Sequence, residues 1–292
     1  MQTMVMNQSS STIVEPAISP AGIKTILFHV QNDASLTERL DCALSIARTF
    51  GAHLHLLHVT PIEAFTVTDA FATFVNADII AVLEDEAGKL RARVEKKLEV
   101  EDVSWDYEEV TGTLMTHLLQ RASLADLLIV GREPHEWLSG RSPVGSLGDM
   151  LHEMRTPIFI PGEGQSQVDL FGPAIVAWNG STEAANALRS AVPLLKLASQ
   201  VNVISIEESV DRRFPPTDAP EYLSRHGIHA DLVVRPAVDG NVLEELLDEA
   251  VISGAAYIVM GGYSHSRAGE FFFGGLTRSL LKSCEVGLFV NR

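Results

Sequence analysis

Short apolar runs alternate with amphipathic segments along the chain, and this alternation predicts strands and helices in turn. Residues 26–30 (ILFHV) form the first apolar run. A polar turn follows, and then apolar residues recur at helical spacing at Leu36, Leu40, Ala43, Leu44 and Ala47. The run HLHLLHV at 53–59 predicts the next strand. Apolar strands separated by amphipathic helices are typical of a parallel sheet covered on both faces.

The same order of elements occurs a second time. Residues 174–178 (AIVAW) match the first apolar run, and the helix that follows has Ser181 or Thr182 as a natural N-cap. Later runs also agree between the halves, namely ADLLIVG at 125–131 with AAYIVMG at 255–261, and 157–160 with 287–290. The chain is therefore predicted to be an internal duplication.

A chain of 292 residues is long enough for two domains of average size. The predicted fold is α/β, with two tandem Rossmann-like domains that each have a five-stranded, mostly parallel sheet flanked by helices. The predicted boundaries are a flexible leader at 1–21, a first domain at 22–162, a linker at 163–171 and a second domain at 172–292. The first domain carries an insertion around residues 61–102, which we interpret as a longer crossover, with a lid as the alternative.

Composition narrows the function classes. The 22 basic and 38 acidic residues give a formal charge of -16, which repels nucleic acid, so no nucleic-acid partner is predicted. No apolar run is long enough to cross a bilayer, so no membrane partner is predicted. The two cysteines, Cys42 and Cys284, form no disulfide framework and no zinc spacing, and the expected location is cytoplasmic.

A glycine-rich stretch follows the apolar run that ends the fourth strand of the second half. Residues 260–281 read MGGYSHSRAGEFFFGGLTRSLL and carry five glycines before a predicted helix. In a doubly wound sheet, ligands bind beyond the carboxyl ends of the strands, and a helix N-terminus there attracts phosphate. Glycines also serve tight turns, so the stretch alone leaves both interpretations open.

Both halves resemble the universal stress protein family in its tandem form, over about residues 22–292. In nucleotide-binding members the fourth strand is followed by Gly, two residues, Gly, nine residues, and then Gly with Ser or Thr. Gly261 and Gly274 fit the first and third glycines, since 274 minus 261 gives the expected 13. Ser264 replaces the second glycine, and Gly275 replaces the Ser or Thr.

The resemblance implies that ATP, or another adenine nucleotide, binds in the second domain. Adenine would lie near Asn179 and Val203, where Asn179 replaces the family's aspartate, and the phosphates would lie near Gly261, Gly274 and Thr277. The full set of implied binding residues is Asn179, Val203, Met260, Gly261, Ser264, Gly274, Gly275, Leu276 and Thr277.

The first half matches the nucleotide motif less well. Gly131 and the pair Gly145–Ser146 are spaced one residue too far apart, since 145 minus 131 gives 14. Pro134 stands where the second glycine belongs and has no N–H to offer a phosphate. Gln31 replaces the aspartate of the first strand. The first half is therefore not expected to bind ATP in the manner of the family.

Three further features have both a structural and a functional interpretation. His53 and His55 share one strand face, but without a further ligand at a recognisable spacing they do not predict a metal site. Trp178, at the mouth of the second crevice, either stacks on a base or fills an empty crevice. Arg132 and Arg278 flank the glycine-rich loops, where pairing with surface carboxylates is favoured over phosphate contact.

No known catalytic motif is present in the sequence, so no enzyme activity is assigned. A weak ATPase activity is a third, weaker alternative. Two functions stay open. The first is a regulatory stress-response module that binds an adenine nucleotide, and the second is a degenerate tandem module that binds no nucleotide and acts through protein contacts. The resemblance also implies that the last strands of the two halves pair as an intramolecular pseudo-dimer, and a homodimer of the whole chain is a further expectation.

Overall fold

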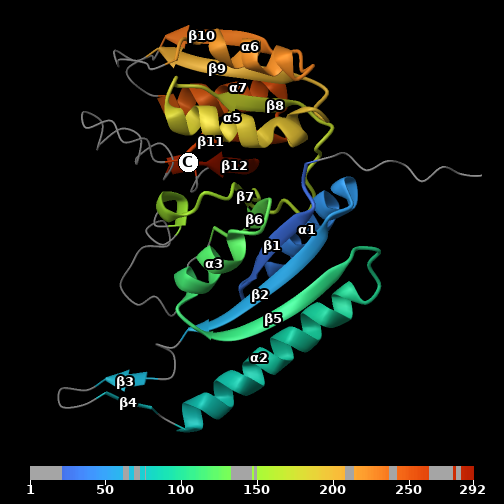
Figure 1. Cartoon of the computed structure of the whole chain (residues 1–292), viewed down its shortest axis with the longest axis vertical. Helices are drawn as coiled ribbons and strands as arrows, with labels where there is room; N and C mark the ends of the chain where they lie inside the picture. The colour runs from blue at the N-terminus through green and yellow to red at the C-terminus, as the bar shows by residue number, and fades with distance from the viewer. Residues whose placement is uncertain are drawn as a thin grey trace, which may run out of the picture.

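The computed structural model describes residues 22–61, 66–68, 73–75, 77–132, 147, 150–207, 214–236, 242–262, 279–280 and 284–292. Among them a single twisted ten-stranded sheet dominates, with helices on both of its faces (Figure 1). The strand order is β10-β9-β8-β11-β12-β7-β6-β1-β2-β5. The predicted α/β fold with a mostly parallel sheet is confirmed.

The first half of the chain forms five neighbouring strands at one end of this sheet. Its sheet strands are β1 (Thr25–Val30), β2 (His53–Pro61), β5 (Trp105–Gly112), β6 (Leu127–Ile129) and β7 (Ile158–Ile160). Its helices are α1 (Leu36–Phe50), α2 (Ala77–Leu98) and α3 (Leu114–Ala122). β2 and β5 pair in parallel, so the chain segment with α2 is a crossover, as the sequence favoured. A separate hairpin of β3 (Thr66–Thr68) and β4 (Thr73–Val75) precedes α2 and was not predicted.

The second half repeats this arrangement. Its strands are β8 (Ala174–Ala177), β9 (Val201–Glu207), β10 (Asp231–Pro236), β11 (Tyr257–Gly261) and β12 (Gly287–Asn291). Its helices are α5 (Thr182–Leu195), α6 (Asp218–Arg225) and α7 (Val242–Ser253). In both halves the strands stand in the order third, second, first, fourth, fifth, which is a doubly wound topology.

The two halves meet at their last strands. β7 and β12 pair antiparallel, with Phe159 opposite Phe289, as the resemblance implied for the pseudo-dimer. Arg132, just after β6, reinforces the seam from the side: its Nε donates to the Pro161 carbonyl at 2.9 Å and its Nη2 to the Val286 carbonyl at 3.1 Å. Its Nη1 donates to the Cys284 carbonyl. One guanidinium therefore ties the first half to the chain that enters β12.

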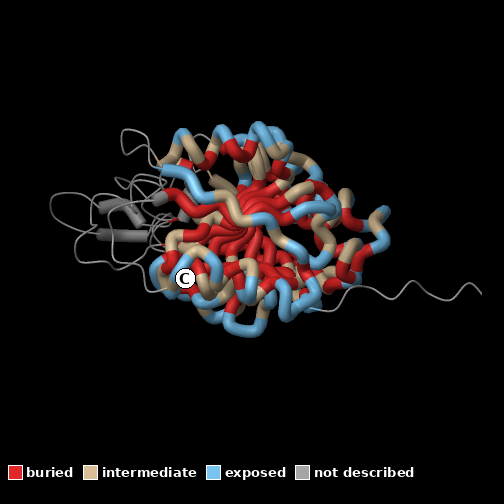
Figure 2. The backbone as a smooth tube through the Cα atoms, turned by 90° about the horizontal axis from the view of Figure 1, so that it is seen from above, coloured by how far each residue is buried: buried red, intermediate tan, exposed pale blue. Residues whose placement is uncertain are grey.

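The core has two apolar layers, one on each face of the sheet, and buried residues run through the whole stack of strands (Figure 2). One layer packs under α1, α2, α5 and α6, and the other under α3, α7 and the segment around residues 147–154. The apolar stripes read from the sequence are the buried faces of α1 and α5. Within the described part of the chain, no helix is both long and apolar enough to span a membrane.

Candidate functional site

Each half has one crevice of the kind that binds ligands in doubly wound sheets. β8 lies between β9 and β11, and β1 lies between β2 and β6, so the strand order reverses at these two first strands. The carboxyl ends of the strands diverge there, and the N-terminus of the following helix, α5 or α1, points toward the gap. The two crevices have the same topology, and their side chains decide what each can bind.

In the second half, Asn179 and Gly261 follow or end the two central strands. The Asn179 Oδ1 accepts from the Ser181 N–H at 3.1 Å, and the Ser181 hydroxyl accepts from the Ala184 N–H at 3.1 Å. These two bonds fix the start of α5, since they satisfy N–H groups that a helix terminus leaves free. Gly261 lies directly under that start: a Cβ added to it would stand 2.5 Å from the Ala184 nitrogen.

Two of the other implied binding residues, Val203 and Met260, are described by the structure and are buried. Val203 is not exposed at all and pairs with Val176 and Leu232 in the middle of β9, so its side chain belongs to the core and does not line the crevice. Met260 is also buried, at 3% exposure, under the other face of the sheet. The remaining residues, Ser264, Gly274, Gly275, Leu276 and Thr277, lie outside the described residues.

The Trp178 side chain is packed in the core and is not exposed to the crevice. Its side chain is only 4% exposed and lies in the core layer under α5 and α6. The indole N–H donates to the Pro215 carbonyl at 3.1 Å, and the ring lies 6.4 Å from that of Phe214. Of the two roles that the sequence left open, the structure therefore favours the filling one, because both the ring and its polar atom are occupied by the protein.

A cavity of about 600 Å³ opens beside the N-terminus of α5. It is lined by Thr182, Glu183 and Asn186 of α5, by Arg292, and by Leu119 and residues 152–155 of the first half. Arg155 is exposed, and no described residue gives it a hydrogen bond or an ion pair. The sequence did not single out this arginine, because it lies far from the glycine-rich stretch and reaches the second half only through the antiparallel seam.

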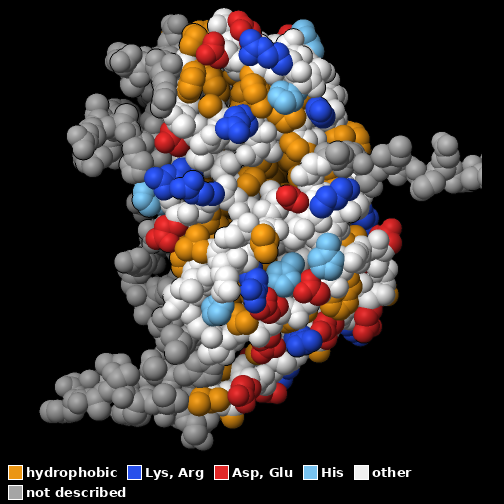
Figure 3. All heavy atoms as spheres, in the orientation of Figure 1, with side chains coloured by type: hydrophobic (Ala, Val, Ile, Leu, Met, Phe, Trp, Pro, Cys, Tyr) orange, Lys and Arg blue, Asp and Glu red, His pale blue; other side chains and the backbone are white. Residues whose placement is uncertain are grey.

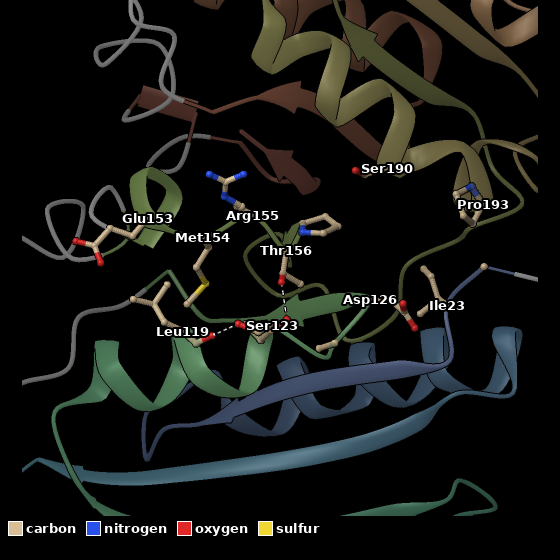
Figure 4. Close-up of a pocket in the computed structure, with 14 residues that line it drawn as sticks. Ile23, Leu119, Ser123, Asp126, Glu153, Met154, Arg155, Thr156, Ser190 and Pro193 are labelled. Atoms are coloured by element: carbon tan, nitrogen blue, oxygen red, sulfur yellow. Dashed lines mark hydrogen bonds between the residues drawn. The ribbon is translucent and has the colours of Figure 1, made fainter.

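A second cavity of about 600 Å³ continues along the seam (Figure 4). Its hydroxyl groups are already used: Thr156 donates to the Ala122 carbonyl at 2.6 Å and Ser123 to the Leu119 carbonyl at 2.8 Å. Arg155 lines this cavity too, and in Figure 4 its side chain points toward the second half. The two cavities therefore share two charged side chains, the Arg155 guanidinium and the Glu153 carboxylate, and only the guanidinium attracts an anion.

In the first half, the space beside the equivalent glycine is filled by an arginine side chain. A Cβ added to Gly131 would stand 2.6 Å from Nη1 of Arg39, which comes from α1 and is 2% exposed. Its guanidinium pairs with Asp33, with 3.1 Å between Nη2 and Oδ2, and donates to the Ser35 hydroxyl at 2.7 Å and to the Gln31 carbonyl at 3.3 Å. It also lies 5.6 Å from the centre of the Phe28 ring.

The first-half cavity has about 520 Å³ and two arginines in its wall, Arg39 and Arg132. Both are committed to the protein: Arg39 to Asp33, and Arg132 to three carbonyls at the seam. Burial lowers the pKa of Arg132 from its usual value, although an arginine stays charged over the physiological range. Each guanidinium would have to give up these contacts in order to bind a phosphate.

A cluster of histidines and carboxylates covers the outer strands of the first half. The Asp106 carboxylate accepts from His53 Nε2 at 2.7 Å and lies 2.8 Å from His55 Nδ1, while Glu108 pairs with His55 and Arg121. Figure 3 shows histidine and acidic side chains beside one another over this end of the sheet. No group of three or more metal-binding side chains with suitable geometry occurs among the described residues.

Comparison with known proteins finds solved structures with the same fold and one family model that matches the first half. A universal stress protein from Archaeoglobus fulgidus DSM 4304 superposes with a TM-score of 0.69 at 16% identity, covering 92% of this chain and 96% of that chain. A functionally unknown protein from Pseudomonas aeruginosa PAO1 superposes with a TM-score of 0.54 at 19% identity, covering 92% of each chain. The family model described as the universal stress protein family matches residues 22–151. No curated protein sequence matches the chain.

Fold and seam together define a tandem α/β protein of two Rossmann-like halves. The first half of the chain, residues 22–151, matches the model of the universal stress protein family, and the second half repeats the same topology.

Proposed function

We propose that this chain is a regulatory stress-response module that binds an adenine nucleotide, ATP, in its second half only. The observation that supports this proposal is that the arginines of the first-half cavity have partners within the chain and Arg155 of the second-half cavity has none among the described residues. Arg39 and Arg132 of the first-half cavity are paired with a carboxylate and with carbonyls, whereas Arg155 of the second-half cavity has no partner among the described residues. A planar guanidinium suits a phosphate group, and an unpaired one gains most from it.

The residues around Arg155 are compatible with a bound nucleotide. The start of α5 provides helix-dipole attraction for an anion, and Arg292, whose guanidinium donates to the His152 carbonyl, adds a second positive charge at the cavity wall. The carboxylates of Glu183 and Glu153 repel an anion, so the nucleotide is expected to bind more weakly than in a site lined only by basic groups. The glycine spacing between Gly261 and Gly274 supports the same half. No reaction is assigned, and the cytoplasmic location stays a prediction.

The second candidate is a module that binds no nucleotide and acts through protein contacts. Trp178 favours it, since its buried indole donates to Pro215 and leaves no ring face for a base. The close approach of Gly261 to Ala184 also favours it, because that part of the crevice is already filled by backbone. The two candidates differ in a single measurable property, the affinity for nucleotide.

Isothermal titration of the full chain with ATP separates them. We expect one site per chain, and we expect Arg155→Gln to weaken binding about tenfold or more, because it removes a charge-assisted contact. Arg189→Gln is the matched control: Arg189 is also exposed, lies on α5 and lines neither cavity, so its loss should leave the affinity unchanged. Absence of any heat at millimolar ATP would exclude the first candidate and leave the second.

A further inference from the structure

β10 (Asp231–Pro236) is the last strand at one end of the sheet and has only one neighbour, β9, among the described strands. It lies at the top of the molecule in Figure 1. The strand is poorly covered: Asp231, Arg235 and Pro236 are exposed and Val234 is 43% exposed. An edge strand offers a row of N–H and C=O groups to another strand. Its side chains decide whether a second strand can pair with it.

The side chains of β10 are complementary to themselves in one antiparallel register. If Val233 faces Val233 of a second copy across a two-fold axis, Asp231 faces Arg235 of the other chain, and Arg235 faces its Asp231. On the opposite face, Leu232 meets Val234 of the other chain in both directions. Directly opposed opposite charges and aliphatic pairs each stabilise a sheet by about 0.2 to 1 kcal/mol. Pro236, which has no N–H, falls just outside this register.

We propose that the chain forms a homodimer in which the β10 strands of two copies pair antiparallel about Val233 and extend the sheet across the interface. The partner that this edge fits is a second copy of the same chain, since a two-fold interface requires a surface complementary to itself.

The surroundings of β10 hold its charged side chains in place for this pairing. Arg235 pairs with the buried Glu249 of α7, with 2.7 Å between Nη2 and Oε1, which orients the guanidinium while leaving its side chain 48% exposed. Asp231 lies 3.6 Å from the His229 imidazole. A guanidinium has five donors, so Arg235 can contact Glu249 and an opposing carboxylate together.

The opposite edge of the sheet lacks this complementarity. β5 carries Asp106, Glu108 and Glu109 and no basic residue, so no two-fold register brings opposite charges together there. Two of its carboxylates are paired within the chain, Asp106 with His53 and His55, and Glu108 with His55 and Arg121. Self-association is therefore expected at β10 and not at β5.

A charge exchange between two copies tests the pairing directly. In sedimentation velocity at micromolar concentrations, the wild-type chain is expected to form a dimer of twice 31.7 kDa. Asp231→Arg and Arg235→Glu should each weaken that dimer about tenfold or more, because each places like charges opposite one another at two positions. An equimolar mixture of the two variants should dimerise again, since all four charges are then opposed by their opposites.

The control is Asp248→Arg, which makes the same charge change at an exposed position of α7 away from the strand. It should leave the dimer as in the wild type. A wild-type chain that stays monomeric throughout overturns the proposal. So does a dimer that survives both single variants, or a mixture that associates no better than either variant alone.

Discussion

The crevices of the two halves share one topology and differ in what occupies the space beside the glycine that follows the fourth strand. Beside Gly131 lies the guanidinium of Arg39, held by a buried carboxylate, and beside Gly261 lies the backbone of α5 at Ala184. The two cavities also differ in their arginines. Arg39 and Arg132, in the wall of the first-half cavity, are paired within the chain, whereas Arg155, in the wall of the second-half cavity, has no partner among the described residues. The two halves have the same strand order, while a few side chains give the two crevices different chemistry.

The largest effect is expected from removing the side chain that closes the first crevice. Arg39→Ala should lower the free energy of unfolding by about 3–5 kcal/mol, because the buried Asp33 carboxylate would keep its charge without its ion-pair partner and with only the Ser35 hydroxyl donating to it. Denaturant unfolding followed by circular dichroism measures the loss.

The matched variant replaces both charges. Arg39→Met combined with Asp33→Asn should recover most of the lost stability, since no unpaired charge then stays buried. If the single and the double variant are equally unstable, packing and not the ion pair holds this crevice closed.

The two glycines should respond unequally to a methyl group. Gly261→Ala should cost about 2–3 kcal/mol, because its Cβ would stand 2.5 Å from backbone and α5 would have to move. Gly131→Ala should cost about 1 kcal/mol, since the obstructing atom, Nη1 of Arg39 at 2.6 Å, ends a flexible side chain. Thermal and denaturant unfolding compare them.

Gly88→Ala serves as the control for the glycine pair. It lies in α2 with no atom within 4 Å of an added Cβ, and it should raise stability by about 0.5–1 kcal/mol. Equal losses at Gly131 and Gly261 would show that the two crevices are filled alike.

The seam offers a test of how firmly the halves are joined. Arg132→Met should lower the free energy of unfolding by about 2 kcal/mol, because it leaves the Pro161, Cys284 and Val286 carbonyls without their donor. Hydrogen exchange should rise in β7 and β12 more than in β9 or β2. An increase spread evenly over the sheet would mean that Arg132 stabilises one half locally and does not fasten the seam.

Much of the fold could be predicted from the sequence. The strands are short continuous apolar runs and the helices have regular stripes, so the doubled order of elements was visible. The pairing of β7 with β12 came from the family resemblance. The resemblance implied that Val203 lies near the adenine, and the structure shows its side chain buried within β9.

The roles of Arg39 and Trp178 could not be predicted in the same way. Arg39 does fall three residues after Leu36 and four before Ala43, inside the apolar stripe, and this position was the available signal for burial. The partner of Trp178, Pro215, is 37 residues away and follows a stretch with no regular pattern. Arg155 reaches the second half only across the seam, so its place depends on tertiary structure.

The smallest effect concerns the acid stability that the ion pair between Glu108 and Arg121 gives to the outer strands of the first half. The hydrogen bond and charge of Arg121, with His55, hold the pKa of Glu108 below its usual value despite partial burial. A lowered folded-state pKa contributes stability above the ordinary glutamate pKa of about 4.3, and this contribution of about 1 kcal/mol is lost as the pH falls through the folded value. Unfolding of wild type and Glu108→Gln against pH should show curves that converge in acid. Parallel curves would contradict this role.

Hydrogen–deuterium exchange of the full chain with and without saturating ATP tests the central claim that one half binds nucleotide and the other does not. The account predicts slower exchange at residues 179–186 and 260–262 on addition of ATP, and no change at residues 31–39 and 130–132. Equal protection of both segments, or protection of the first half alone, would contradict it.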